Sequence, residues 1–166
     1  CSQSRGLGDV YKRQMLEAIA EVADSVGAYL LCDEVYRGTG QVGDGMVPSI
    51  VDIYHRGIST AGMSKVFSLA GLRVGWVVAP KEVTEKIMIH RDYDTISVGM
   101  LNDHFAAIAL ENAESVLSRS RKITRENLAI LEEWINKEPR VSWVKPRAGT
   151  TAMLKLDVPM TCREFC

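Results

Sequence analysis

The chain has 166 residues, of which 46% are hydrophobic and 25% are charged, and its formal net charge is −1. This composition is typical of a soluble globular protein, and the balance of 20 basic and 21 acidic residues offers no field that would attract nucleic acid or an anionic membrane. Because the longest apolar runs are far shorter than the ~20 residues that cross a bilayer, we expect a small-molecule partner, with no nucleic acid and no membrane.

Both ends of the chain are unusual. Residues 1–14, CSQSRGLGDVYKRQ, show no apolar period and resemble a translated adaptor segment, so we exclude them from the fold prediction. Near the other end, Thr161 is a candidate N-cap for a helix that has barely begun. We therefore expect a fragment that is truncated at both ends.

The four cysteines lie far apart or at the ends of the chain, and none forms a C-x-x-C pair. This spacing favours neither a disulfide framework nor a metal site, and Cys32 is predicted to be a small buried apolar residue. Free cysteines of this kind are typical of a reducing compartment, so we expect the protein in the cytoplasm.

The first half of the chain predicts one helix and two strands. Apolar residues at helical spacing predict a helix over 15–26. Residues 28–33, AYLLCD, form an apolar run that ends in a carboxylate, the pattern of a buried parallel strand. The Gly-rich segment within 39–55 predicts an irregular surface excursion, and 57–61 predicts a second strand that leads into a loop with Lys65.

The second half begins with a third strand over 72–79, followed by helices over 83–91 and 101–112. A long helix is predicted within 113–137, and period-two alternation after it indicates strands between 141 and 156. The apolar stripe of the long helix consists of Leu117, Ile123, Leu128, Leu131 and Ile135. The order of elements is that of an α/β protein followed by part of a smaller α+β unit.

Two motifs carry the chemistry. Residues 62–75, GMSKVFSLAGLRVG, place a lysine after Ser64 and an arginine within Gly71-x-Arg73-x-Gly75. This stretch resembles the cofactor-attachment signature of the class I/II aminotransferases at every constrained position. Residues 33–38, DEVYRG, begin 32 residues before the lysine and resemble a second motif of the same family at the end of a strand.

The resemblance extends from about residue 15 to the end of the chain, and it implies the fold-type I architecture of enzymes that depend on pyridoxal 5'-phosphate. On this basis, residues 15–120 are the second half of a cofactor-binding large domain with a mostly parallel sheet. Residues 121–166 are then the start of a truncated, smaller C-terminal domain.

Each candidate site residue has a role that the resemblance implies. Lys65 would attach the cofactor as a Schiff base and then move a proton between the substrate and the cofactor, which requires partial desolvation of its amine. Asp33 would keep the pyridine nitrogen protonated, and Tyr36 would bond the cofactor's 3′ oxygen. Arg73 and Ser64 would bind the phosphate.

Taken singly, these residues have plainer interpretations. Asp33 alone is more often a strand-end turn residue, and Lys65 alone is more often a solvated surface lysine. Arg73 and Tyr36 alone fit an ion pair and the edge of a core. Only their order and spacing together support a cofactor site. One departure is Gly62, because many aspartate-type members have a phosphate-binding serine there.

The resemblance implies an aminotransferase that moves an amino group from an amino acid to a 2-oxo acid. The intact protein would be a homodimer, with Ser97 a weak candidate for a contact to the partner's site. The resemblance implies that the N-terminal half of the enzyme and the substrate-carboxylate arginine, expected beyond residue 166, are both missing. We therefore expect the 166 residues alone neither to bind the cofactor tightly nor to be active. Two alternatives stay open: a C–S β-lyase on the same fold, and an aminotransferase-like sensor domain of a transcription regulator.

Overall fold

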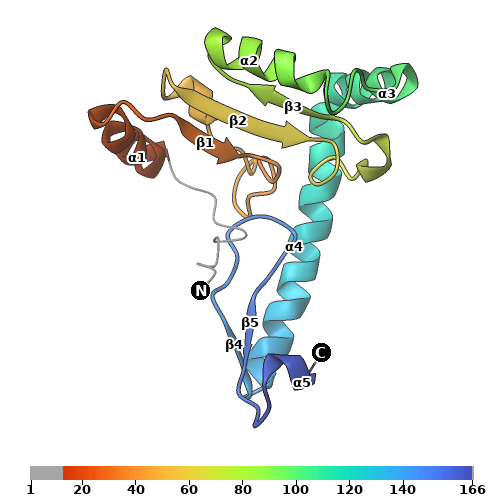
Figure 1. The fold of residues 1–166 in the computed structure, drawn as a ribbon. Coiled ribbons are helices and arrows are strands. Elements are labelled where there is room, and N and C mark those ends of the chain that lie inside the picture. Colours follow the sequence, from red (N-terminus) through yellow and green to blue (C-terminus); the bar gives the residue numbers. More distant parts are fainter. Residues whose placement is uncertain (1–12, 166) are drawn as a thin grey trace.

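The computed structural model describes residues 13–165, which form a three-stranded sheet, a long helix and a two-stranded hairpin (Figure 1). Residues 1–12 of the predicted adaptor segment lie outside the described residues. Arg13 and Gln14, which we had excluded, already belong to the first helix.

The first sheet contains β1 (Leu30–Asp33), β2 (Gly57–Gly62) and β3 (Gly75–Val78) in that order. β1 is parallel to β2, but β3 is antiparallel to β2, so the sheet is mixed. The prediction of a mostly parallel sheet is therefore confirmed only for the first pair. A parallel third strand would need a crossover connection, usually a helix, whereas residues 63–74 double back beside β2.

The described helices agree with the predicted ones to within a few residues. They are α1 (Arg13–Ser25), α2 (Lys81–Arg91), α3 (Met100–Glu111), α4 (Ala113–Lys137) and α5 (Cys162–Phe165). The predicted cap of α5 is confirmed, because the Glu164 backbone N–H donates to Thr161 Oγ1 at 3.3 Å and the Glu164 carboxylate accepts from the Thr161 N–H. No helix among residues 13–165 is long and apolar enough to cross a membrane.

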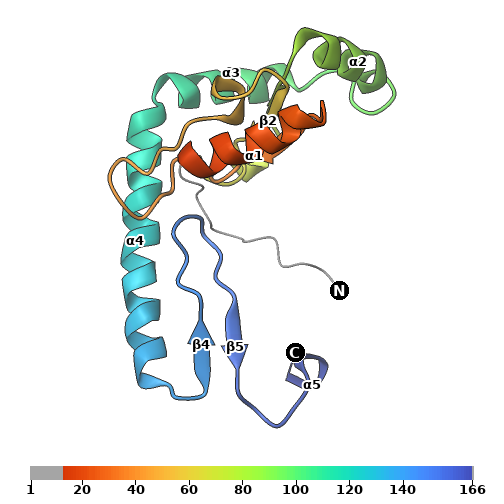
Figure 2. The same ribbon diagram turned by 90° about the vertical axis from the view of Figure 1, so that its left-hand side faces the viewer.

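α4 connects the first sheet to the hairpin of β4 (Val141–Trp143) and β5 (Leu154–Leu156), which runs alongside its second half (Figures 1 and 2). The tip of the hairpin turns back toward the loop that follows β1 (Figure 2). This return places residues from the end of the chain near the end of β1.

Two buried clusters form the core. The larger one joins the segment after β2 to α3 and α4, and it consists of Met63, Val66, Phe67, Ala106, Ala109 and Leu117. Trp76 of β3 packs edge-on against Phe67 with ring centroids 6.3 Å apart, which joins the sheet to this cluster. The smaller cluster consists of Ala20, Ile50 and Tyr54 and lies between α1 and β1.

Three burial predictions are wrong. β1 is only half-buried, and Leu31 is 61% exposed, because the cluster beneath α1 covers only the face that carries Leu30 and Cys32. The segment 39–55 is not a plain surface excursion, since Thr39 and Ile50 are fully buried. In α4, Ile123 of the predicted stripe is exposed, because the middle of the helix runs between the two sheets (Figure 2).

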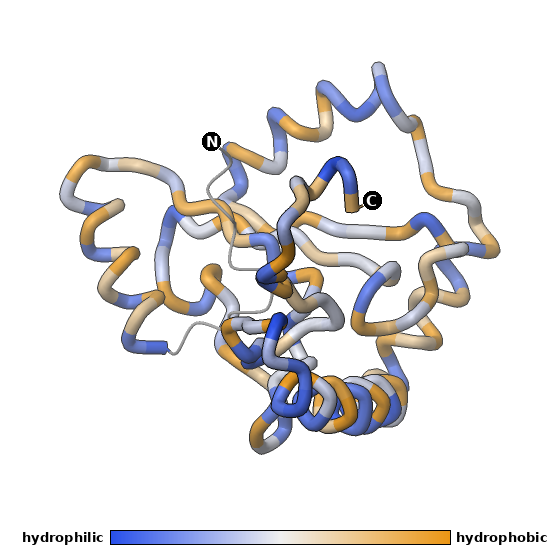
Figure 3. The backbone as a smooth tube through the Cα atoms, turned by 90° about the horizontal axis from the view of Figure 1, so that it is seen from below, coloured by the Kyte–Doolittle hydropathy of each residue, from blue (hydrophilic) through white to orange (hydrophobic). Residues whose placement is uncertain are grey.

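Apolar residues also lie on outer surfaces. Figure 3, which views α4 nearly end-on, shows apolar and polar segments alternating around that helix and apolar segments on the peripheral helices. On α3, Met100 is 82% exposed and Leu101 is 66% exposed. The outer side of α3 is thus not covered by residues 13–165.

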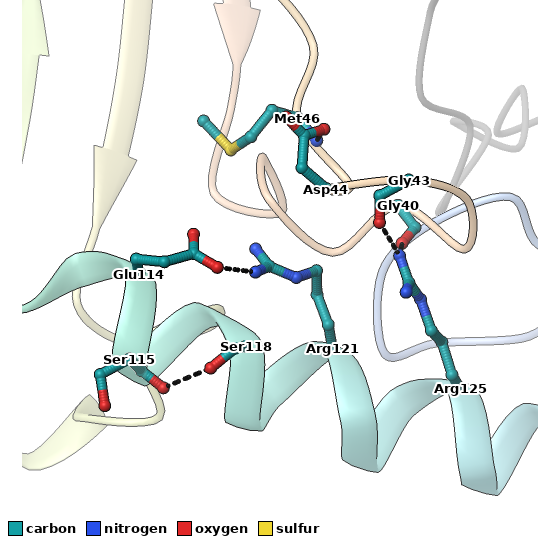
Figure 4. Close-up of polar contacts among 9 residues, drawn as sticks. All are labelled: Gly40, Gly43, Asp44, Met46, Glu114, Ser115, Ser118, Arg121 and Arg125. Atoms are coloured by element: carbon teal, nitrogen blue, oxygen red, sulfur yellow. Dashed lines mark hydrogen bonds and ion pairs between the residues drawn. The ribbon is translucent and has the colours of Figure 1, made fainter.

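Two arginines of α4 contact the loop that follows β1 (Figure 4). Arg125 Nη2 donates to the carbonyl oxygens of Gly40 at 2.8 Å and Gly43 at 2.7 Å. Arg121, whose side chain is 8% exposed, forms an ion pair with Glu114 of the same helix. The Arg125 guanidinium thereby fixes the loop against the helix.

We predict that Arg125→Ala lowers the free energy of unfolding by about 1–2 kcal/mol, because the two glycine carbonyls lose a charged donor. Urea denaturation measures this loss. Arg119→Ala, at an exposed position of the same helix, is the matched control and should change stability by less than about 0.5 kcal/mol. Equal effects of the two substitutions would contradict the role given to Arg125.

Candidate active site

The first part of the candidate site lies where β1 ends. Asp33 is the last residue of the strand, is exposed, and accepts a hydrogen bond from the Val35 N–H at 3.3 Å. The Glu34 N–H donates to the Thr60 carbonyl at 2.8 Å, which extends the contact between β1 and β2 past the strand end. Tyr36 follows in the turn. The carboxyl ends of parallel strands are where open α/β sheets bind ligands.

The second part lies in the segment between β2 and β3. Met63, Val66 and Phe67 point into the larger core cluster and fix the backbone on either side of Lys65. Lys65 itself is exposed, and Ser64 is half-buried. The expected partial desolvation of the lysine is therefore not found among the described residues, because its buried neighbours turn inward and leave its side chain on the outside.

Two glycines explain why this segment doubles back so tightly. A Cβ atom at Gly62 would come within 3.1 Å of the Val74 carbonyl oxygen, and one at Gly75 within 3.0 Å of the Ala61 carbonyl oxygen. Such contacts are tighter than side chains ordinarily accept. The close approach of β2 and β3 at Gly62 thus leaves little space for a side chain.

The same segment contains backbone strain. Ser68 and Arg73 have φ angles of 58° and 52°, and within residues 13–165 they are the only residues other than glycine with positive φ. Arg73 follows the short 3-10 helix Ala70–Leu72, and its Nη1 donates to the Ala70 carbonyl at 3.0 Å. We predicted it at the start of a strand, but it lies two residues before β3. Strained backbone of this kind costs about 1–3 kcal/mol per residue and concentrates at functional sites.

Tyr36 is the point where the predicted residues come together. Hydrogen bonding from the Thr151 side chain lowers the pKa of the Tyr36 phenol, with smaller lowering effects from Thr150 and from the positive charge of Lys65. Partial burial and the negative charge of Asp33 act in the opposite direction. Tyr36, Lys65 and Asp33 therefore share one electrostatic environment. No hydrogen bond or ion pair within the described residues joins Arg73 or Ser64 to it.

Several residues at the site escaped prediction. Thr150 and Thr151 lie in the loop between β4 and β5, more than 100 positions from Tyr36 in the sequence, and no local pattern connects them. Glu34 could have been found, since it is part of the DEVYRG motif. Its carboxylate accepts hydrogen bonds from Ser49 Oγ and the Ile50 N–H, both at 2.8 Å, and so holds the start of the smaller core cluster.

Comparison with known proteins decides the family. The profile of aminotransferase class I and II matches residues 1–165. The chain belongs to this aminotransferase family. Among curated relatives, the aromatic-amino-acid aminotransferase 2 of Thermococcus litoralis is 32% identical over 95% of this chain and 42% of its own length. The capreomycidine synthase of Streptomyces vinaceus is 31% identical over 67% of this chain and 29% of its own.

Solved structures of aminotransferases resemble this chain as well. A PLP-dependent aminotransferase from Streptococcus suis 89-1591 superposes with a TM-score of 0.90 at 42% identity, and the match covers 98% of this chain and 42% of that one. The chain thus has the fold of an aminotransferase but spans less than half the length of these relatives.

We predict that Ser68→Gly stabilises the fold by about 1 kcal/mol, because relief of the positive φ outweighs the extra freedom that glycine gives the unfolded chain. Thermal or urea unfolding measures the change. Ser115→Gly, at an exposed position inside α4, is the opposite case and should cost about 0.5 kcal/mol. Destabilisation by both substitutions would show that Ser68 is not strained.

Proposed function

We propose that the protein carrying this chain is a pyridoxal-phosphate-dependent aminotransferase that moves an amino group from an amino acid to a 2-oxo acid. The observation that carries the proposal is the shared environment of Tyr36, Lys65 and Asp33 on the family's two motifs. The aminotransferases among the relatives and solved structures support it.

The chemistry of the donor set fits pyridoxal phosphate. Lys65 offers an exposed primary amine that can hold an aldehyde covalently, and Tyr36 offers a phenol with lowered pKa beside it. Asp33 offers a carboxylate to a protonated ring nitrogen. Arg73 and Ser64 offer a guanidinium and a hydroxyl to a phosphate group. When bound, the cofactor supplies an electron sink for the α-carbon of the substrate.

In this proposal Lys65 also transfers a proton. Its Nζ, once free, accepts a proton from the substrate α-carbon as a general base and returns it as a general acid. Tyr36 and Asp33 orient the group that Lys65 serves, because they present a phenol and a carboxylate where β1 ends. Lys65 is exposed within the described residues, which leaves its amine accessible to a substrate.

The domain division, the oligomeric state, the cellular location and the substrates are also proposals. Residues 15–120 are assigned to the cofactor-binding large domain and 121–166 to the smaller C-terminal domain. We assign the intact protein to a homodimer in the cytoplasm, with amino acids and 2-oxo acids as substrates. The names of the relatives favour amino-group transfer over the C–S lyase and the transcription regulator.

The activity test uses a protein that contains residues 15–165 and has the full length of the relatives. Glutamate is supplied with a panel of 2-oxo acids, and formation of the new amino acid is measured. Lys65→Ala should reduce the rate by roughly 10²–10⁴-fold or more, since the proton-transfer group is lost. Lys81→Ala, an exposed lysine at the start of α2, is the matched control and should leave the rate unchanged.

Two outcomes would contradict the proposal. Release of pyruvate and ammonia from cystathionine, with no new amino acid from glutamate and any oxo acid, would identify a lyase. Binding of pyridoxal phosphate without turnover of either substrate, in a protein with a winged-helix domain upstream, would identify a regulator.

A further inference from the structure

Thr39, the residue that follows the DEVYRG motif, has a fully buried side chain. Its Oγ1 donates to the Tyr36 carbonyl oxygen at 2.6 Å, and its backbone N–H donates to the same oxygen at 3.2 Å. Two hydrogen bonds to one carbonyl oxygen restrict rotation about the Cα–C bond of that residue, and the direction of a side chain depends on the dihedrals of its own backbone. Thr39 therefore limits the directions in which the Tyr36 side chain can leave the turn.

The same hydroxyl is bonded to a distant part of the chain. Its Oγ1 accepts from the Gly149 N–H at 3.0 Å, and Gly149 is buried. A fully buried hydroxyl that donates once and accepts once has a defined rotamer, because rotation would leave a buried polar group without a partner. The orientation of the Thr39 hydroxyl thus depends on the loop between β4 and β5.

A second contact keeps that loop in place. The Gln41 N–H donates to the Arg147 carbonyl oxygen at 3.0 Å, and Ala148, between Arg147 and Gly149, is only 1% exposed. Two hydrogen bonds and one buried side chain therefore hold the tip of the hairpin against the turn that follows β1. Figure 2 shows the tip approaching this turn.

We propose that Thr39 is a positioning residue of the cofactor site, whose hydroxyl holds the backbone of Tyr36 in one conformation and takes its own orientation from the Gly149 N–H of the hairpin. Thr39 is buried, so it acts through Tyr36 rather than by touching a substrate. This inference rests on the proposed function, in which the Tyr36 phenol serves a bound cofactor. It gives the hairpin, which lies outside both family motifs, a share in setting the direction of that phenol.

Other residues of the turn attach it to the segment before β2. The Glu34 carboxylate accepts from the Ile50 N–H at 2.8 Å, and Arg37 Nε donates to the Val47 carbonyl oxygen at 2.7 Å. Loss of the Thr39 hydroxyl leaves these contacts in place while it weakens the link to the hairpin. A Thr39 variant is therefore expected to fold, with its change confined to the turn and the hairpin tip.

The first test measures amide hydrogen exchange by mass spectrometry, without cofactor, on the protein of the activity test. Thr39→Val should speed exchange about tenfold in the peptides that contain Gln41 and Gly149, because a loosened hairpin exposes the Gln41 N–H although its own acceptor is unchanged. Thr39→Ser keeps the hydroxyl and should leave both rates near the native ones. Thr84→Val is the matched control, since it removes a hydroxyl that donates to the Lys81 carbonyl oxygen, three residues earlier in α2.

The second test measures the binding of pyridoxal phosphate to the same protein by equilibrium dialysis, as a double-mutant cycle with Tyr36→Phe. Thr39→Val should weaken binding about tenfold when Tyr36 is present, since the phenol is no longer held in one direction. In the Tyr36→Phe background there is no phenol to position, so the same substitution should weaken binding by less than about twofold. A merely structural role would weaken binding equally in both backgrounds.

Either test can overturn the inference. Unchanged exchange at Gln41 in Thr39→Val, or a loss of affinity that is absent or equal in the two backgrounds, would do so and would leave the aminotransferase proposal intact. A native protein that binds no pyridoxal phosphate would instead overturn the proposed function. The exchange measurement would then still decide whether the Thr39 hydroxyl holds the hairpin to the turn.

Discussion

The close antiparallel approach of β2 and β3 at Gly62 and Gly75 is the constraint on which the candidate site depends. A side chain at either position would press against a backbone carbonyl of the opposite strand, and the segment between the strands leaves and re-enters the sheet at nearly one point. A segment closed in this way has one inner and one outer side. Its apolar residues occupy the inner side against α3 and α4, which leaves Lys65 on the outer side. The position of the lysine is thus set by packing beneath it rather than by contacts of its own.

The second half of the site depends on long-range polar contacts instead. The loop after β1 is rich in glycine and has few apolar side chains, so burial of hydrophobic area cannot hold it. Arg125 of α4 binds two of its carbonyl groups, and Thr39 links it to the hairpin. A charged donor to a carbonyl contributes about 1.5–3 kcal/mol when well formed. Such contacts are directional, and they suit a loop that must present Tyr36 in one orientation.

Local patterns in the sequence were sufficient for the helices, the approximate strands and the two motifs, because helix periodicity and motif spacing are properties of neighbouring residues. They failed where geometry depends on distant partners. The direction of β3 follows from the closure at Gly75, and the exposure of Leu31 from the absence of a covering element on one face of β1 within the described residues. Thr150 and Thr151 could not be foreseen, since only the return of the hairpin brings them to Tyr36.

The convergence on Tyr36 has a consequence for the chemistry. Its acidity depends on a turn after β1, on the lysine segment between β2 and β3, and on the hairpin beyond α4. Family motifs specify the first two, whereas the third lies outside them. The setting of a motif residue in this chain is therefore completed by residues that neither motif contains.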